Sequence, residues 1–181
     1  QKLDLDNFIE YMIANFYGAN SDWDRSSNWY AVRRRNPSGK FRFFVWDGER
    51  TLEGIHDRSI EFDDDGSPPR IFHKLAENAE FRRRFSEHAH RDLLGGGGLT
   101  TERASQRYRI WSNRLDLAII AESARWGDYR RDVHPYKEGP YDLYTRDKYW
   151  KPEVDRLLNE YFPARGAVLR EQFRSQGLYL E

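Results

Sequence analysis

The sequence predicts a mainly helical α+β fold with one embedded β-hairpin. Apolar residues recur at helical spacing over residues 5–17 and, with short interruptions, from residue 69 almost to the end of the chain. Between these stretches, two apolar runs flank an Asn-Pro-Ser-Gly turn within residues 28–47, which is typical of a hairpin. The 181 residues allow a substantial core and contain no internal repeat, so we expect a single domain over residues 1–181.

Composition and charge exclude several classes of site and partner. Thirty Lys and Arg residues balance thirty Asp and Glu residues, so no nucleic-acid partner is expected. The absence of Cys excludes disulfides, thiolate metal sites and cysteine nucleophiles. No apolar run approaches the roughly 18 residues of a membrane span and no signal peptide opens the chain, so no membrane partner is expected.

The first helix is predicted over residues 5–17, with Asp4 or Asp6 as its N-terminal cap and Gly18 as its stop. After the hairpin, residues 47–68 are polar and acidic and are predicted to form a loop. The apolar face of the first helix consists of Phe8, Ile9, Met12, Ile13, Phe16 and Tyr17.

Helices follow one another through the second half of the chain. Residues 69–76 and 78–94 are predicted helices, and the glycines of residues 95–98 make a flexible connection to the next one. The remaining predicted elements are a long helix over 101–126, a loop to about residue 144, a helix from Thr145 to about residue 161, and a last helix that Pro163 opens and that ends near Gln176. The inward face of the long helix is predicted to carry Tyr108, Trp111, Leu115, Ala118 and Ile119.

The hairpin is predicted to bring an amide and a carboxylate side by side. If residues 36–39 form the loop, the numbers of paired residues sum to 75 and Asn28 faces Asp47. Their Cβ atoms would then lie roughly 4.5–5.5 Å apart. Tyr30, Val32, Phe43 and Val45 would share this face and be buried, whereas the tip would pair Arg33 with Arg42 and Arg35 with Lys40. Like charges directly opposite each other are destabilising, so the tip should be solvated or neutralised by an anion.

Two further carboxylates, Asp22 and Asp24, lie in the turn between the first helix and the hairpin. Amide and carboxylate oxygens are the ligands of a small hard cation such as Mg²⁺. An acidic loop followed by an Asn, a hairpin and an Asp is the metal and base arrangement of phosphotransferases. The alternative interpretation is that both Asp residues simply form the turn.

Several segments together resemble the CotH kinase family, atypical protein-kinase-like enzymes named for a spore-coat protein. The segments that carry the resemblance are Leu5-Asp6-Asn7-Phe8-Ile9, Asn28-Trp29-Tyr30, residues 39–47, Phe81-Arg82 and Tyr161-Phe162-Pro163-Ala164-Arg165. The resemblance covers nearly the whole chain and implies the helical, C-terminal lobe of a kinase, as part of a longer protein. It implies transfer of the ATP γ-phosphoryl group to Ser or Thr of a protein substrate, with Mg²⁺ or Mn²⁺, a nucleotide-binding lobe upstream, and a location at the cell surface or outside the cell.

The resemblance also implies roles for individual residues. Asp22 would orient and deprotonate the attacking hydroxyl, and Asn28 and Asp47 would hold the divalent cation. Glu49 stands where the family often has a second Asp, and its oxygens lie one methylene further out. Ordinary kinases separate the catalytic Asp and Asn by five positions, whereas Asp22 lies six and Asp24 four before Asn28, so Asp24 stays an alternative.

Two other functions remain open at this stage. One is a pseudokinase or structural interaction domain of a larger surface protein, with the fold retained and the chemistry lost. The other is a small-molecule phosphotransferase of the aminoglycoside or choline kinase type, but no His-Gly-Asp loop precedes Asn28.

Overall fold

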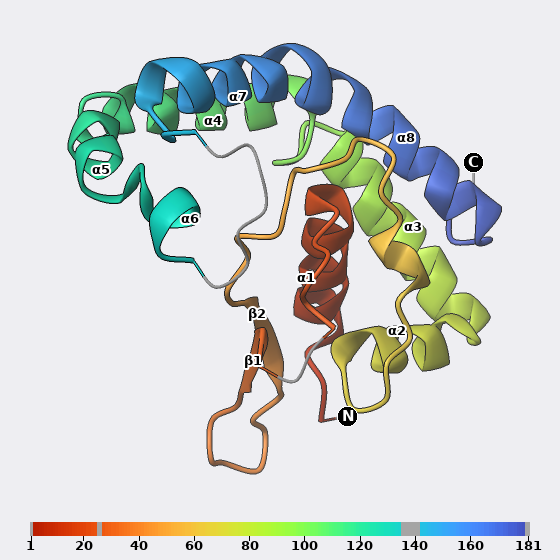
Figure 1. Ribbon diagram of the computed structural model, residues 1–181. Helices are drawn as coiled ribbons and strands as arrows, with labels where there is room; N and C mark the ends of the chain where they lie inside the picture. The colour runs from red at the N-terminus through yellow and green to blue at the C-terminus, as the bar shows by residue number, and fades with distance from the viewer. Residues whose placement is uncertain (1, 25–26, 135–141, 180–181) are drawn as a thin grey trace. The chain divides into compact units, whose positions relative to one another are not determined.

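The computed structural model describes residues 2–24, 27–134 and 142–179 (Figure 1). Contacts along the chain divide it into two compact units, Gln1–Thr101 together with Ala164–Glu181, and Glu102–Pro163. Two compact units can belong to one domain, so the single domain over 1–181 stays a prediction. The described part confirms the mainly helical α+β fold with one antiparallel hairpin.

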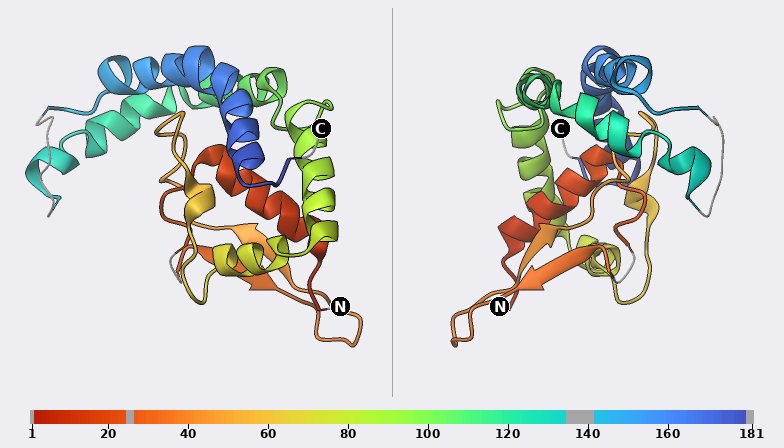
Figure 2. Two further views of the ribbon diagram at one scale, coloured as in Figure 1. Left: turned by 90° about the vertical axis from the view of Figure 1, so that its right-hand side faces the viewer. Right: turned by 60° about the vertical axis from the view of Figure 1, so that its left-hand side comes forward.

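Helix α1 (Leu5–Gly18) is the centre of the first unit. The other helices of this unit are α2 (Pro68–Ala76), α3 (Ala79–Leu93) and α8 (Phe162–Ser175), with a short 3₁₀ turn, η1 (Ser59–Glu61). Figures 1 and 2 show α1 with α3 along its side and α2 near one end. The predicted helices at 5–17, 69–76 and 78–94 are therefore confirmed to within two residues at each end.

Four phenylalanines, one from each helix, pack against one another in the core of the first unit. Their ring centroids lie 5.0 to 5.9 Å apart in edge-to-face contacts. Such aromatic contacts add to the free energy gained by burying the rings. The four residues are Phe16, Phe72, Phe85 and Phe173, and each is at most 1% exposed.

Local capping explains where α1 begins and ends. The Asp4 carboxylate accepts a hydrogen bond from the Asn7 amide, which confirms Asp4 as the N-terminal cap. Asp6 has another role, because its carboxylate binds Arg84 and His88 of α3. The Arg84 hydrogen bond lowers the pKa of Asp6, with a smaller contribution from His88. At the other end, Ala19 adopts the left-handed conformation that closes the helix, with φ of 50°.

The hairpin forms, but the predicted pairing is wrong by one residue. Strands β1 (Trp29–Val32) and β2 (Arg42–Val45) pair so that residue numbers sum to 74, with Ala31 opposite Phe43. Continued by one residue, this register places Asn28 level with Trp46 and not with Asp47. The predicted buried face is also wrong, because Tyr30, Val32 and Val45 are about half exposed while Phe43 is buried.

Contacts from outside the hairpin set this register. The Asn7 side chain accepts from the Phe43 amide at 2.6 Å and donates to the Phe43 carbonyl at 3.2 Å. The N-terminal segment pairs with Phe41 through its backbone: Asp4 N–H donates to the Phe41 carbonyl, and Phe41 N–H donates to the Lys2 carbonyl. These bonds occupy the outer edge of β2, so Phe43 turns its side chain onto Phe8 of α1, at a centroid distance of 5.0 Å.

The second unit contains α4 (Thr101–Leu115), α5 (Ala118–Trp126) and α6 (Tyr129–Asp132). The later helix consists of α7 (Lys151–Arg156) between two wider turns of π-helix, η2 (Arg146–Trp150) and η3 (Leu157–Tyr161). This run confirms a helix from about residue 145 to 161, and Pro163 lies in the first turn of α8 as expected. None of the described helices is both long and apolar enough to span a membrane.

The predicted helix over 101–126 is two helices, interrupted at Asp116 and Leu117. Arg146 binds the Asp116 carboxylate at this interruption, at 3.2 Å. The expected inward face is also wrong, because Trp111, Leu115 and Ala118 are exposed. The buried positions of α4 are instead the small residues Ala104 and Ser112, on the side where Tyr108 contacts Phe162. Small side chains allow a close approach at this contact, and the apolar residues Trp111 and Leu115 of the same helix stay exposed.

Candidate functional site

The predicted site residues Asp22 and Asn28 are in direct contact. The Asn28 side-chain amide donates to the Asp22 carbonyl at 2.8 Å and to its carboxylate Oδ2 at 2.9 Å. Its Oδ1 accepts from the Ser27 hydroxyl at 2.9 Å. Asn28 is only 7% exposed, so these bonds form largely away from water. The contact joins the bend after α1 to the residue before β1 and fixes the direction of the Asp22 carboxylate.

A series of hydrogen bonds between buried side-chain amides connects Asp22 to α1. The Asp22 backbone N–H donates to Oδ1 of Asn20, whose Nδ2 donates to Oδ1 of Asn15. Asn15 in turn donates to the Tyr11 carbonyl, one helical turn earlier in α1. Asn15 and Asn20 are at most 3% exposed. Buried polar groups that are fully hydrogen-bonded are held rigidly, so this series links the position of Asp22 to the frame of α1.

Trp23 anchors the bend that carries the two Asp residues. It is fully buried, and its ring packs on Tyr11 and Phe16 at centroid distances of 5.8 and 5.6 Å. Burial also raises the pKa of the Tyr11 hydroxyl beneath the bend. Because Asp22 and Asp24 flank Trp23 in the sequence, this anchor limits how far either residue can move. Both Asp residues are half-buried.

The loop after the hairpin carries Asp47 and Glu49, and both side chains are exposed. Asp47 has a φ of 52°, in the left-handed region that Asp tolerates better than most residues. Backbone bonds hold this loop beside the end of α1: Ser21 donates to the Arg50 carbonyl at 3.0 Å, and Leu52 to the Gly18 carbonyl at 2.7 Å. The loops of Asp22 and Asp47 are therefore neighbours, although the predicted pairing of Asn28 with Asp47 on one rung does not occur.

Arg50 introduces a positive charge between these loops that the sequence analysis missed. The pKa of the Arg50 guanidinium lies above its usual value, mainly because the Glu53 carboxylate binds it. The negative charges of Asp22 and Glu49 make smaller contributions in the same direction. Arg50 therefore interacts electrostatically with two of the four acids of the candidate site, one from each loop.

The side-chain oxygens of Asn28, Asp47 and Glu49 are of the chemical type that binds a small hard cation. Asn28 Oδ1 keeps a second lone pair beside the hydrogen bond from Ser27, and the neighbouring ligands would be carboxylate oxygens. Within residues 2–24, 27–134 and 142–179, no three acidic or histidine side chains converge as a ready-made metal cage. Mg²⁺ commonly takes only one or two protein carboxylates and completes its shell with water and substrate phosphates.

Comparison with known proteins identifies the family. The family model described as CotH kinase protein matches residues 1–169 of the 181. A search of curated proteins and a search of solved structures find no match. The matched region contains α1, the Asp22–Asn28 loop, the hairpin and the start of α8. Since the match extends over far more than half of the sequence, the chain belongs to the CotH kinase protein family.

Proposed function

We propose that this chain is the catalytic lobe of a protein kinase that transfers the ATP γ-phosphoryl group to Ser or Thr hydroxyls of a protein. Membership of the CotH kinase family indicates a kinase-like function. The observation that carries the proposal is the pair of hydrogen bonds from Asn28 to Asp22. One bond holds the Asp22 backbone carbonyl and the other its carboxylate, and the same Asn28 side chain carries an oxygen that can bind a metal. Phosphoryl transfer needs such a base and such a metal ligand close together.

In this proposal Asp22 is the catalytic carboxylate. The substrate hydroxyl oxygen forms a bond to the γ-phosphorus while the bond from that phosphorus to the β,γ-bridging oxygen breaks, which releases ADP. The hydroxyl proton passes to the Asp22 carboxylate. The direct contact with Asn28 and the series of amide hydrogen bonds through Asn20 support Asp22 over Asp24 for this role.

Asn28, Asp47 and Glu49 are the proposed ligands of Mg²⁺ or Mn²⁺, which supplies positive charge to the transferring phosphoryl group. Glu49 and Asp47 lie on the loop that Ser21 and Gly18 hold beside the Asp22 loop. We also propose that the residues that hold the ATP phosphates belong to a separate lobe of the intact protein. Family membership implies a protein substrate in general terms.

The test is phosphate incorporation from labelled ATP into protein by the intact protein. Asp22→Ala should lower the rate by about 10²–10⁴-fold, the usual contribution of a general base. Asp24→Ala should lower it much less, and Asp47→Ala should abolish transfer without unfolding the protein. Asp64→Ala, in the acidic loop, is the matched control and should retain the wild-type rate. Equal, mild losses for Asp22→Ala and Asp24→Ala would mean that neither is the base, and wild-type turnover by Asp47→Ala would remove Asp47 from the mechanism.

A second candidate function is an interaction domain without phosphoryl transfer. It is favoured by one observation: both ends of the Asn28 amide already form hydrogen bonds, to Asp22 and to Ser27, without a metal. Calorimetry of the intact protein with Mg-ATP separates the two functions. Binding without any phosphate incorporation, unchanged by Asp22→Ala, would support the second.

A further inference from the structure

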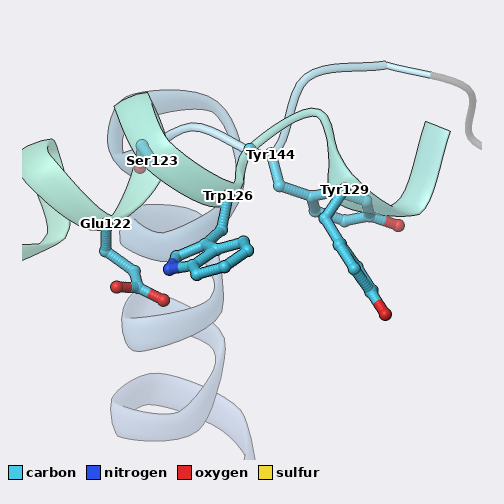
Figure 3. A pocket seen from close by; sticks show the side chains of 6 residues that line it. Glu122, Ser123, Trp126, Tyr129 and Tyr144 are labelled. Carbon is cyan, nitrogen blue, oxygen red and sulfur yellow. The ribbon is translucent and has the colours of Figure 1, made fainter. Parts of the chain in front are cut away.

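A cavity in the second unit has aromatic side chains as half of its lining residues. It has a volume of about 610 Å³ and lies where α5 ends and the chain returns toward η2. Figure 3 shows Glu122, Trp126 and Tyr129 pointing to the same side of the chain, with Tyr144 behind Trp126 and Tyr129. The lining residues are Glu122, Ser123, Trp126, Gly127, Tyr129 and Tyr144.

Two aromatic rings form a corner of this cavity. The planes of Trp126 and Tyr129 meet at 80°, with a centroid distance of 6.2 Å. Both residues are partly exposed, so part of each ring is accessible to a ligand. The face of an aromatic ring carries negative electrostatic potential and attracts cations, most strongly for Trp.

The backbone beneath these rings is closely packed. Tyr144 donates from its backbone N–H to the Gly127 carbonyl at 2.8 Å. A Cβ atom at Gly127 would lie 2.4 Å from the Ser123 carbonyl oxygen and 2.7 Å from that of Tyr144, so only glycine allows this approach. The approach sets Tyr144 beside the C-terminal end of α5, where the helix dipole also favours a positive charge.

The acid of the cavity is available to a ligand. Glu122 forms no ion pair with any residue in the part of the chain that the structure describes. Arg131 and Lys148 pair with Asp132 and Asp142, and Arg125 lies over the Trp126 ring. Three aromatic rings and a carboxylate without an ion pair among the described residues are groups that attract a cation.

We propose that this cavity binds an organic cation of the alkylammonium class, with the ring faces around its alkyl groups and Glu122 as the counter-charge. Purely apolar ligands would leave the carboxylate desolvated, and small inorganic cations would lose water without gaining ring contacts of comparable strength. A quaternary ammonium group meets both requirements, whether it belongs to a free small molecule or to a methylated lysine side chain. This inference is independent of the phosphoryl transfer proposed above.

Ring stacking by the chain's own arginine does not account for the site. Arg125 lies over the Trp126 ring at 4.8 Å, but Arg114 lies over the Trp111 ring at 4.9 Å in the same way. Trp111 does not line the cavity. Both tryptophans carry an arginine over the ring, but only Trp126 lines the cavity together with Glu122. Trp111 is therefore a matched control.

The first experiment titrates the full chain with choline and with its uncharged isostere 3,3-dimethylbutan-1-ol by calorimetry at constant ionic strength. Choline should bind at least about tenfold more tightly than the alcohol. Trp126→Ala should remove choline binding, whereas Trp111→Ala should retain it, and circular dichroism should show that both variants are folded. Equal affinity for the alcohol, or no saturable binding of choline, would overturn the proposal.

Glu122→Gln keeps the shape of the side chain and removes its charge. It should weaken choline binding about tenfold and leave the alcohol unaffected, whereas Glu102→Gln, on α4, should change neither. Unchanged choline affinity in Glu122→Gln would refute the role of the acid and with it the proposal. A peptide with trimethyllysine then distinguishes the source of the cation: tighter binding than choline indicates a protein ligand, and weaker binding a small molecule.

Discussion

Arg165 is fully buried, and its guanidinium donates to backbone carbonyls of four residues. Two of these, Phe16 and Tyr17, are in the last turn of α1, where carbonyls have no partner within the helix. The others, Ile55 and Asp57, belong to the loop after the hairpin. A cation at a helix C-terminus also interacts favourably with the helix dipole. Arg165 thus joins α8 to the end of α1, directly before the loop that carries Asp22.

Arg165→Lys should destabilise the protein by about 3 kcal/mol or more. A lysine ammonium lacks the planar fork of arginine, and each buried carbonyl left without a partner costs roughly 1–3 kcal/mol. Urea unfolding should show this loss as a lower midpoint. Arg174→Lys, an exposed residue of the same helix paired with Glu171, should change stability by less than about 0.5 kcal/mol. Equal midpoints for the two variants would contradict the structural role of Arg165.

Residue type allowed part of the candidate site to be predicted. Asp22 and Asn28 were identified from their chemistry and from the resemblance, although their spacing is one position longer than in ordinary kinases, and the structure brings these two together. The roles of Asn15 and Asn20 were not predicted. In the sequence, an amide within or just after an apolar helical stripe cannot be distinguished from a surface residue, because its hydrogen-bond partner is not known. The one signal was position: Asn15 falls on the buried side of α1, where a polar residue needs an internal partner.

At the scale of elements, periodicity predicted the helices but the pairing of the hairpin could not be read from its own residues. The four-residue loop assumed for 36–39 would have set Arg33 against Arg42 and Arg35 against Lys40. The strands instead stop at Val32 and Arg42, and residues 33–41 form a longer loop that avoids facing like charges. The register of the two strands also depends on Asn7, which lies 36 residues before Phe43 in the sequence.

Asn7→Ala should loosen β2 without unfolding α1. The substitution removes both side-chain bonds to Phe43, so the outer edge of the strand loses its fixed partner. The Phe43 amide should then exchange with solvent at least about tenfold faster, as measured by NMR hydrogen exchange. Asn36→Ala, in the exposed hairpin loop, is the control and should leave Phe43 protected. Unchanged protection in Asn7→Ala would show that the strand pairing alone fixes the register.

The two units of the molecule differ in how completely they bury their apolar residues. The first unit buries large side chains from every helix, including Phe8, Met12, Phe72 and Phe173. In the described part of the second unit, large apolar side chains stay at least one-third exposed along α4, α5 and the segments that follow. These residues are Ile110, Trp111, Leu115, Leu117, Ile120, Trp126, Tyr129, Val133 and Leu143. Composition gives no sign of this difference, because both units are rich in aromatic residues.

We therefore expect the second unit to open at lower free energy than the first in the intact protein. Fewer buried apolar contacts hold α4 and α5, and the wide π-turns of η2 and η3 flank a single short helix. Native-state hydrogen exchange should give protection factors at least about tenfold lower for amides of α4, such as Ser112, than for amides of α1, such as Ile13. Both residues are buried, so simple exposure does not explain a difference. Equal protection would mean that the units unfold as one cooperative structure.

Saturation of the aromatic cavity with choline should raise protection in α5 and leave α1 unchanged, because a ligand stabilises only the state that binds it.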